Sequence, residues 1–328
     1  MKKSLFLHIG SHKTATTFIQ SSLARNGPLL KDLGILYPKA GRIHQAHFKL
    51  CWALRDPANS SAALEDIEDW AALFEEIDAA PQQVVVLSSE EFGLAIDPRR
   101  LERLADRYDV SVIHYLRSPD SYLESFYNQV VKDFGTRESR TIESYITEEP
   151  LFFLETMNLL SPWEKMFGKD AVRLRLFGRK HLPNGILHDF LETLGCRRFP
   201  EFRPPDDAVL HKKSLPPDAL EYLRLSNPWM EKEEGHHPFV RQLVELSLAN
   251  ESALQQTRAG LLSLRARQTL RKRFRDTNRQ AARKFLDTGR TPFPPNETPS
   301  PPADFQRRLP EATPLIMGRI AAMIRDMR

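Results

Sequence analysis

Short apolar runs rich in β-branched residues recur along the first part of the chain. They predict buried strands at Leu5–Ile9, Val84–Leu87, Val110–Leu116 and Val172–Leu176. A further short strand is expected at Gly34–Tyr37. Helical patterns separate these runs, which indicates crossover connections. The expected fold class is therefore α/β, a doubly wound parallel sheet with helices on both faces.

The pattern turns almost wholly helical beyond about residue 185. The expected helices are Ile186–Leu194, Pro217–Leu225, Pro238–Leu248 and a long basic helix over residues 264–286. We therefore expect one domain over residues 1–290. It comprises an α/β core over about 1–195 and a helical part over about 196–290.

The C-terminal residues form an appendage to this domain. Six prolines between Thr291 and Pro302 predict an extended connector, assigned to residues 291–311. An amphipathic helix is expected over residues 312–328. Its apolar face suits docking onto the protein's own core, with contact to a membrane surface or to a partner subunit as alternatives. The pattern does not determine the oligomeric state.

The charge balance argues against a nucleic-acid-coating protein. Of 328 residues, 47 are Lys or Arg and 43 are Asp or Glu, so the formal net charge is only +4. An anion site must therefore be local. The basic helix is either a solvated face or a rim that attracts an anionic acceptor or cofactor. Between Arg265 and Lys284 its only aromatic residue is Phe274, too few for base stacking, so we expect no nucleic-acid partner.

The N-terminus, the length of the apolar runs and the spacing of the cysteines bear on the cellular compartment. The apolar run after the initial lysines stops at Ile9, short of the roughly 7–15 apolar residues of a secretory signal. No run approaches the roughly 18 apolar residues of a membrane span. Cys51 and Cys196 are far apart and have no metal-binding spacing, which is typical of free thiols. A cytoplasmic location is expected.

The turn after the first strand predicts an anion site. Gly10 begins the turn, and a helix with Ala15, Phe18, Ile19 and Leu23 on one face follows it. A strand, a turn and a helix N-terminus together direct backbone N–H groups and the positive helix end at one point. Lys13 adds a positive charge, and three threonines add hydroxyl groups. The Walker A pattern is absent, since its two glycines would stand at positions 7 and 12.

A second strand–turn–helix follows the strand Val110–Leu116. Arg117 stands at the strand end, and Ser118 and Pro119 suit the start of a helix. Ser125 follows about two turns into that helix. A planar guanidinium can bind a phosphate through two hydrogen bonds, and a hydroxyl can bind a third oxygen. Both turns lie at the carboxyl ends of parallel strands, where open α/β sheets bind ligands.

These two motifs resemble those of sulfotransferases that use 3′-phosphoadenosine 5′-phosphosulfate (PAPS). The family's phosphosulfate loop usually reads Lys-[Ser/Thr]-Gly-Thr-[Thr/Ser], and Ala15 stands where glycine is commonest. The likeness covers roughly residues 4–195. It implies that the 5′-phosphosulfate is held by Ser11, His12, Lys13, Thr14, Ala15, Thr16 and Thr17. It implies that Arg117 and Ser125 hold the 3′-phosphate.

The resemblance implies transfer of a sulfuryl group from PAPS to a hydroxyl or amine of a glycan, lipid or small metabolite. Lys13 would stabilise negative charge on the leaving oxygen. No metal is expected, because the sequence has no clustered ligands of the usual spacing. The alternatives are a kinase-like phosphotransferase, which the missing Walker glycines disfavour, and a non-catalytic nucleotide-binding protein.

The base for such a transfer has several candidates. Glu90, then Glu91, follow the strand Val84–Leu87 and so stand at the same sheet edge as Lys13. His44 and His47 share a face at their i, i+3 spacing, and a neutral imidazole can take a proton near pH 7. The sequence leaves these four open. His8, inside the first strand, is expected to be a core residue.

Overall fold

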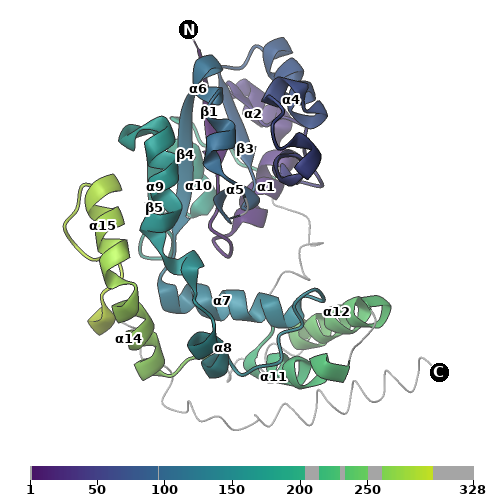
Figure 1. The fold of residues 1–328 in the computed structure, drawn as a ribbon, viewed down its shortest axis with the longest axis vertical. Helices are drawn as coiled ribbons and strands as arrows, with labels where there is room; N and C mark the ends of the chain where they lie inside the picture. The colour runs from purple at the N-terminus through teal and green to yellow at the C-terminus, as the bar shows by residue number, and fades with distance from the viewer. Residues whose placement is uncertain (1, 95, 204–213, 230–232, 250–260, 298–328) are drawn as a thin grey trace. The chain divides into compact units, whose positions relative to one another are not determined.

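Figure 1 shows the fold of the chain as a computed structural model. The residues that the structure describes are 2–94, 96–203, 214–229, 233–249 and 261–297. The chain divides into two compact units. Unit 1 comprises Met1–Ser118, Phe153–Pro205 and Phe274–Pro292, and unit 2 comprises Pro119–Phe152, Asp206–Arg273 and Phe293–Arg328. The expected C-terminal helix at 312–328 and most of the expected connector lie outside the described residues.

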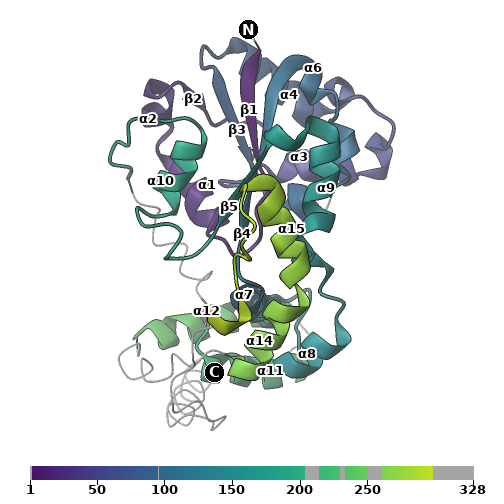
Figure 2. The same cartoon turned by 90° about the vertical axis from the view of Figure 1, so that its left-hand side faces the viewer.

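Unit 1 contains a five-stranded sheet in the order β2-β3-β1-β4-β5, and every pairing is parallel. The strands are β1 (Lys3–His8), β2 (Ile35–Leu36), β3 (Val84–Ser88), β4 (Tyr108–Leu116) and β5 (Val172–Leu176). The register sets His8 at the end of β1 beside Ser88 of β3. The α/β prediction is confirmed, because the four longer apolar runs form β1, β3, β4 and β5 of one parallel sheet, and helices lie on both sides of it (Figure 2).

Helices cover both faces of this sheet in unit 1. They are α1 (Thr16–Arg25), α2 (Gly27–Asp32), α3 (Phe48–Arg55), α4 (Glu68–Ala79), α5 (Glu91–Leu94), α6 (Leu104–Arg107), α9 (Thr156–Phe167), α10 (Ile186–Thr193) and α15 (Arg275–Phe285). Short 3-10 turns, η1 (Pro57–Asn59), η2 (Leu64–Asp66), η3 (Pro98–Leu101) and η5 (Lys169–Ala171), link several of them. Figure 2 shows α1, α2 and α10 on one side of the sheet and α3, α4, α9 and α15 on the other.

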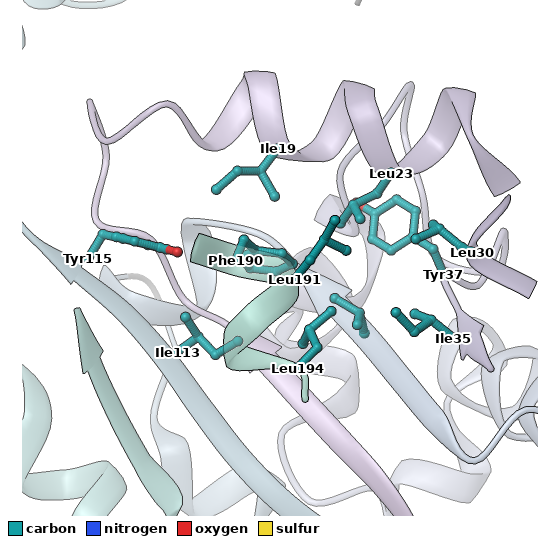
Figure 3. Close-up of a cluster of buried hydrophobic side chains, with 11 residues drawn as sticks. Ile19, Leu23, Leu30, Ile35, Tyr37, Ile113, Tyr115, Phe190, Leu191 and Leu194 are labelled. Atoms are coloured by element: carbon teal, nitrogen blue, oxygen red, sulfur yellow. The ribbon is translucent and has the colours of Figure 1, made fainter. Parts of the chain in front are cut away.

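The core between α1, α10 and the sheet is closely packed (Figure 3). Ile19 and Leu23 of α1 and Phe190 of α10 are fully buried there against the sheet. This burial removes apolar surface from water and positions the first turn of α1 at the end of β1. Phe18 is 41% exposed, so the expectation that it shares the apolar face is wrong. The buried face is completed by polar residues of α1, chiefly Thr16 and Gln20.

Unit 2 is helical in its described parts. It contains α7 (Pro119–Lys132), α8 (Ile142–Glu148), α11 (Pro217–Ser226), α12 (Glu233–Ala249) and α14 (Leu264–Arg273), with η7 (Asn227–Trp229) and η9 (Pro295–Glu297). The expected long basic helix over residues 264–286 is wrong. It consists of α14 and α15, which are separated at the fully buried Phe274 and belong to different units. The backbone of Phe274 has a φ of -99° and a ψ of 14°, which departs from helical values, so the helix is interrupted there.

The basic residues of α14 are partly internal. Asp120 of α7 is fully buried, and its Oδ1 accepts a hydrogen bond from Arg271 Nε at 2.8 Å. Arg267 Nη2 lies 2.6 Å from Glu124 Oε1. These pairs join α7 to α14 inside unit 2, and removal of one partner would leave an uncompensated buried charge. Arg267 and Arg271 are therefore structural residues rather than part of a solvated face.

Among the described residues of unit 1, three imidazoles are buried, those of His8, His47 and His114. Burial lowers the pKa of His8 and of His47 to about 3 and the pKa of His114 to about 4. The nearby His114 lowers the pKa of His8 further. All three are therefore neutral in the folded state at neutral pH, whereas they take up protons near pH 6.5 in the unfolded chain.

We predict that the free energy of unfolding falls as the pH drops from 6.5 towards 4. The unfolded state binds more protons in this window, so each of these histidines contributes a loss of up to about 1.4 kcal/mol per pH unit. Urea unfolding at a series of pH values measures the slope. His114→Asn should reduce it, whereas His44→Asn, at an exposed position, should not. Equal slopes in wild type and His114→Asn would contradict the prediction.

Candidate active site

The turn after β1 is the first part of the candidate site, and it requires glycine where it begins. Gly10 has a φ of +97°, in the left-handed region that favours glycine. A Cβ at this position would lie 3.2 Å from the His12 backbone nitrogen and 3.3 Å from the Glu90 Cβ. Gly10 therefore lets the turn pass close to Glu90, two residues after the end of β3.

The turn continues in an unusual backbone conformation. Lys13 has a φ of 63° and Ala15 a φ of 62°, both in the left-handed region. Thr14 Oγ1 donates a hydrogen bond to the Ser11 carbonyl at 2.6 Å and so closes the turn. Within the described residues, nothing in the structure accepts the backbone N–H groups of His12, Thr14 or Ala15. Donors at the start of a helix form a site for an anion.

Arg117, which follows β4, holds this turn. Its Nη1 donates a hydrogen bond to the Lys13 carbonyl at 2.5 Å, and its guanidinium lies over the Phe177 ring, 5.4 Å from the centroid. Ser11 Oγ donates to the Tyr115 carbonyl at 3.0 Å, and the Tyr115 N–H donates to the Gly10 carbonyl at 2.8 Å. The two sequence motifs of unit 1 are thus brought together at one edge of the sheet.

Glu90 lies between β3 and α5 at the same edge. Its Oε2 accepts a hydrogen bond from Gln20 Nε2 of α1 at 3.0 Å. The neighbouring Glu91 forms an ion pair with Arg55 of α3, at 3.0 Å between Nη1 and Oε2. The two adjacent carboxylates therefore differ in environment, because one is held by a neutral amide and the other by a cation.

His12 lies close enough to these carboxylates to be affected by their charge. Burial lowers the pKa of His12, and the nearby Lys13 lowers it further. Glu90 and Glu91 oppose this effect and raise the pKa, but the net direction is downward. The neutral form of His12 is therefore favoured near neutral pH, and the formal positive charges of the turn are those of Lys13 and Arg117.

The histidines after β2 do not share a face, so that prediction is wrong. His44 is exposed and has a φ of 54°, in the turn where Ile43 and Ala46 pair. His47 is buried, accepts the Ser88 N–H through Nδ1 at 3.1 Å, and donates through Nε2 to the Pro38 carbonyl at 3.1 Å. The left-handed residue interrupts the helical phase, since α3 begins only at Phe48. His47 is therefore a structural residue.

The other predicted residues are distributed over the two units. Thr16 is buried in the first turn of α1, and Thr17 is half-buried beside it. Ser125 is half-buried in α7, which belongs to unit 2. Its participation in a 3′-phosphate site with Arg117 stays a prediction. His8, expected as a core residue, is fully buried, with its Nδ1 2.8 Å from Ser88 Oγ.

Neither a metal centre nor a membrane-spanning helix is found in the parts of the chain that the structure describes. No group of three or more His, Cys, Asp or Glu residues in these parts of the chain is arranged to hold a metal ion. Among the described helices, none combines the length and the apolar character that crossing a bilayer requires.

Comparison with known proteins gives remote matches. No protein-family model matches the chain. An uncharacterised protein of Archaeoglobus fulgidus is 26% identical over 183 residues, which cover 54% of this chain and 46% of that protein. The chain thus spans about half the length of this relative. A sulfotransferase from Alicyclobacillus acidocaldarius matches with a TM-score of 0.41 and 19% identity, over 72% of this chain and 100% of that chain.

Mouse sulfotransferase SULT7A1, solved in complex with PAP, matches with a TM-score of 0.37 and 14% identity over 61% of each chain. The chain is similar in structure to two sulfotransferases.

Sequence reasoning missed Gln20 and the backbone role of Arg117. Gln20 stands between Ile19 and Leu23 on the buried side of α1, so a polar residue inside an apolar stripe was the available signal. No local sequence pattern predicts the hydrogen bond from Arg117 to the Lys13 carbonyl, because the two residues are 104 positions apart.

Replacing Ala15 with glycine should stabilise the protein. The left-handed conformation costs a residue with a Cβ about 1–2 kcal/mol, which Ala15→Gly removes. The greater conformational freedom of glycine in the unfolded chain offsets part of this gain. We expect the free energy of unfolding to rise by about 1 kcal/mol, measured by thermal or urea unfolding. Ala71→Gly, within α4, is the matched control and should lower it by a similar amount. A fall in both variants would contradict the prediction.

Proposed function

We propose that this chain is a PAPS-dependent sulfotransferase. It transfers a sulfuryl group from PAPS to a hydroxyl or amine and leaves adenosine 3′,5′-bisphosphate (PAP). The observation that supports this most is the hydrogen bond from Arg117 to the Lys13 carbonyl. It places a guanidinium beside a turn whose backbone donors suit an anion, so that two anionic ends of one nucleotide can be bound at one sheet edge.

The residues of unit 1 fit the donor substrate. The N–H groups of the turn, with Lys13, Thr16 and Thr17, suit the 5′-phosphosulfate, since helix N-termini bind such groups. Arg117 suits the 3′-phosphate because its planar guanidinium can bind two phosphate oxygens. Ser125 is proposed as its partner. The left-handed φ of Ala15 supports the correspondence with the family loop, where glycine is commonest.

The transfer resembles phosphoryl transfer, which depends mainly on positioning and charge stabilisation. The acceptor oxygen or nitrogen forms a bond to sulfur while the bond from sulfur to the 5′-phosphate oxygen breaks. The acceptor proton passes to Glu90, which we assign as the base. Lys13 stabilises the negative charge that develops on the leaving phosphate oxygen.

The acceptor belongs to one of the classes expected from the sequence: a glycan, a lipid or a small metabolite. A kinase-like phosphotransferase and a non-catalytic nucleotide-binding protein are the competing functions. Binding of PAP rather than ATP distinguishes a sulfotransferase from a kinase-like phosphotransferase. Turnover of PAPS distinguishes it from a non-catalytic nucleotide-binding protein.

Binding of PAP should stabilise the protein and depend on Arg117. Ligand at about 100 times its dissociation constant adds about 2.7 kcal/mol, a readily measured shift of the thermal midpoint. Arg117→Ala removes a charge-assisted contact of about 1.5–3 kcal/mol, so PAP should bind about ten- to a hundredfold more weakly. Arg99→Ala, on the exposed surface of unit 1, is the control. Stabilisation by ATP with magnesium but not by PAP would favour the kinase-like alternative.

Lys13→Ala should reduce transfer more than binding. Removal of one group that stabilises transition-state charge costs about 10²–10³-fold in turnover. The assay measures PAP formed from PAPS with a 4-nitrophenyl glycoside, a long-chain alcohol or an aromatic amine as acceptor. Lys31→Ala, at an exposed position of α2, is the control. Equal losses of turnover and of PAP affinity would make Lys13 an anchor of the ligand only.

A further inference from the structure

We infer that Gln20 is a positioning residue that holds the Glu90 carboxylate for proton transfer and ties it to the helix that follows the phosphosulfate turn. The inference rests on the proposed function. Gln20 is buried on α1, one helical turn after Thr16. Its Nε2 lies 3.0 Å from Glu90 Oε2 and 3.2 Å from Ser88 Oγ.

The amide of Gln20 is itself fixed by a buried polar layer. Ser88 Oγ is 2.8 Å from His8 Nδ1, and the Ser88 N–H donates to His47 Nδ1 at 3.1 Å. Ser88 is fully buried at the end of β3, so it offers a rigid acceptor. An amide nitrogen has two hydrogens, and here one is directed to Ser88 and the other to Glu90. The rotamer that satisfies both bonds places the Nε2 donor at the carboxylate.

A neutral donor suits a base better than a cation does. Gln20 orients the carboxylate without bringing a formal charge that would hold its proton-accepting oxygen in an ion pair, as Arg55 does for Glu91. Thr16 and Gln20 lie on the same side of α1 because residues four apart are neighbours on a helix. The same rigid helix therefore carries the donor-binding turn and the residue that orients the base, and their geometry is fixed together.

The test is a double-mutant cycle between Gln20 and Glu90 with two readouts. The variants are Gln20→Met, which keeps the length of the side chain without donors, Glu90→Gln, and the combination. Turnover is measured as PAP formed from PAPS with the most active acceptor of the three named above. The dissociation constant of PAP is measured by thermal shift. Gln83→Met, at an exposed glutamine of unit 1, is the matched control.

We expect Gln20→Met to lower turnover about tenfold or more, since misplacement of a reacting group by about 1 Å can cost 10²-fold. The dissociation constant of PAP should change less than twofold. In the Glu90→Gln background, Gln20→Met should have little further effect, because the residue acts through Glu90. Gln20→Asn, which keeps the amide but cannot span both acceptors, should show the same pattern and serves if Gln20→Met does not fold.

Four results would overturn the inference. If Gln20→Met weakens PAP binding as much as turnover, or if its effect persists undiminished beside Glu90→Gln, Gln20 has a purely structural role. If Gln20→Met turns over like wild type while Lys13→Ala is impaired, the inference fails and the proposed function stands. If the wild-type protein forms no PAP from PAPS with any of the three acceptors, the proposed function fails and the inference fails with it.

Discussion

The candidate site depends on a turn whose backbone conformation must be held by its surroundings. Lys13 and Ala15 both adopt left-handed conformations, which cost about 1–2 kcal/mol each for residues with a Cβ. Side-chain donors offset this cost by binding carbonyl groups of the turn itself, from Thr14 to Ser11 and from Arg117 to Lys13. One of these donors follows β4, so the shape of the turn depends in part on the pairing of β4 with β1, and the proposed anion site depends on the folded sheet as well as on a local motif.

The layer of polar side chains beneath this turn is neutral, and this limits the positive charge of the site. Burial lowers the pKa of His8 and of His47 far enough that neither imidazole is charged at neutral pH. A neutral imidazole can accept a hydrogen bond, as His47 does from the Ser88 N–H. The ends of β1 and β3 are thus joined through hydrogen bonds, while the positive charge belongs to Lys13 and Arg117, nearer the proposed ligand.

The sheet and the turn could be predicted from sequence because each has a local signature. The β-branched runs of β3 and β4 distinguish buried strands, and Gly10, Lys13 and the threonines mark a strand–turn–helix. Pairings between distant residues have no such signature. The bond between Asp120 and Arg271 joins residues 151 positions apart, and the sequence showed only a basic helix. The prediction that His44 and His47 share a face is wrong because the i, i+3 rule applies within a helix, and these two residues lie in a turn before α3.

The four candidates for the base become unequal once their surroundings are known. Both ring nitrogens of His47 are engaged, and His44 stands on an exposed turn with left-handed backbone. The carboxylate of Glu91 is held in an ion pair with Arg55, so this oxygen is already engaged by a charged side chain. Glu90 lies against the turn itself, since a Cβ at Gly10 would lie 3.3 Å from the Glu90 Cβ. Position and charge therefore both favour Glu90 as the base. Glu90 accepts a hydrogen bond from the neutral amide of Gln20, whereas Glu91 pairs with the cation of Arg55, so the two carboxylates are not equivalent candidates.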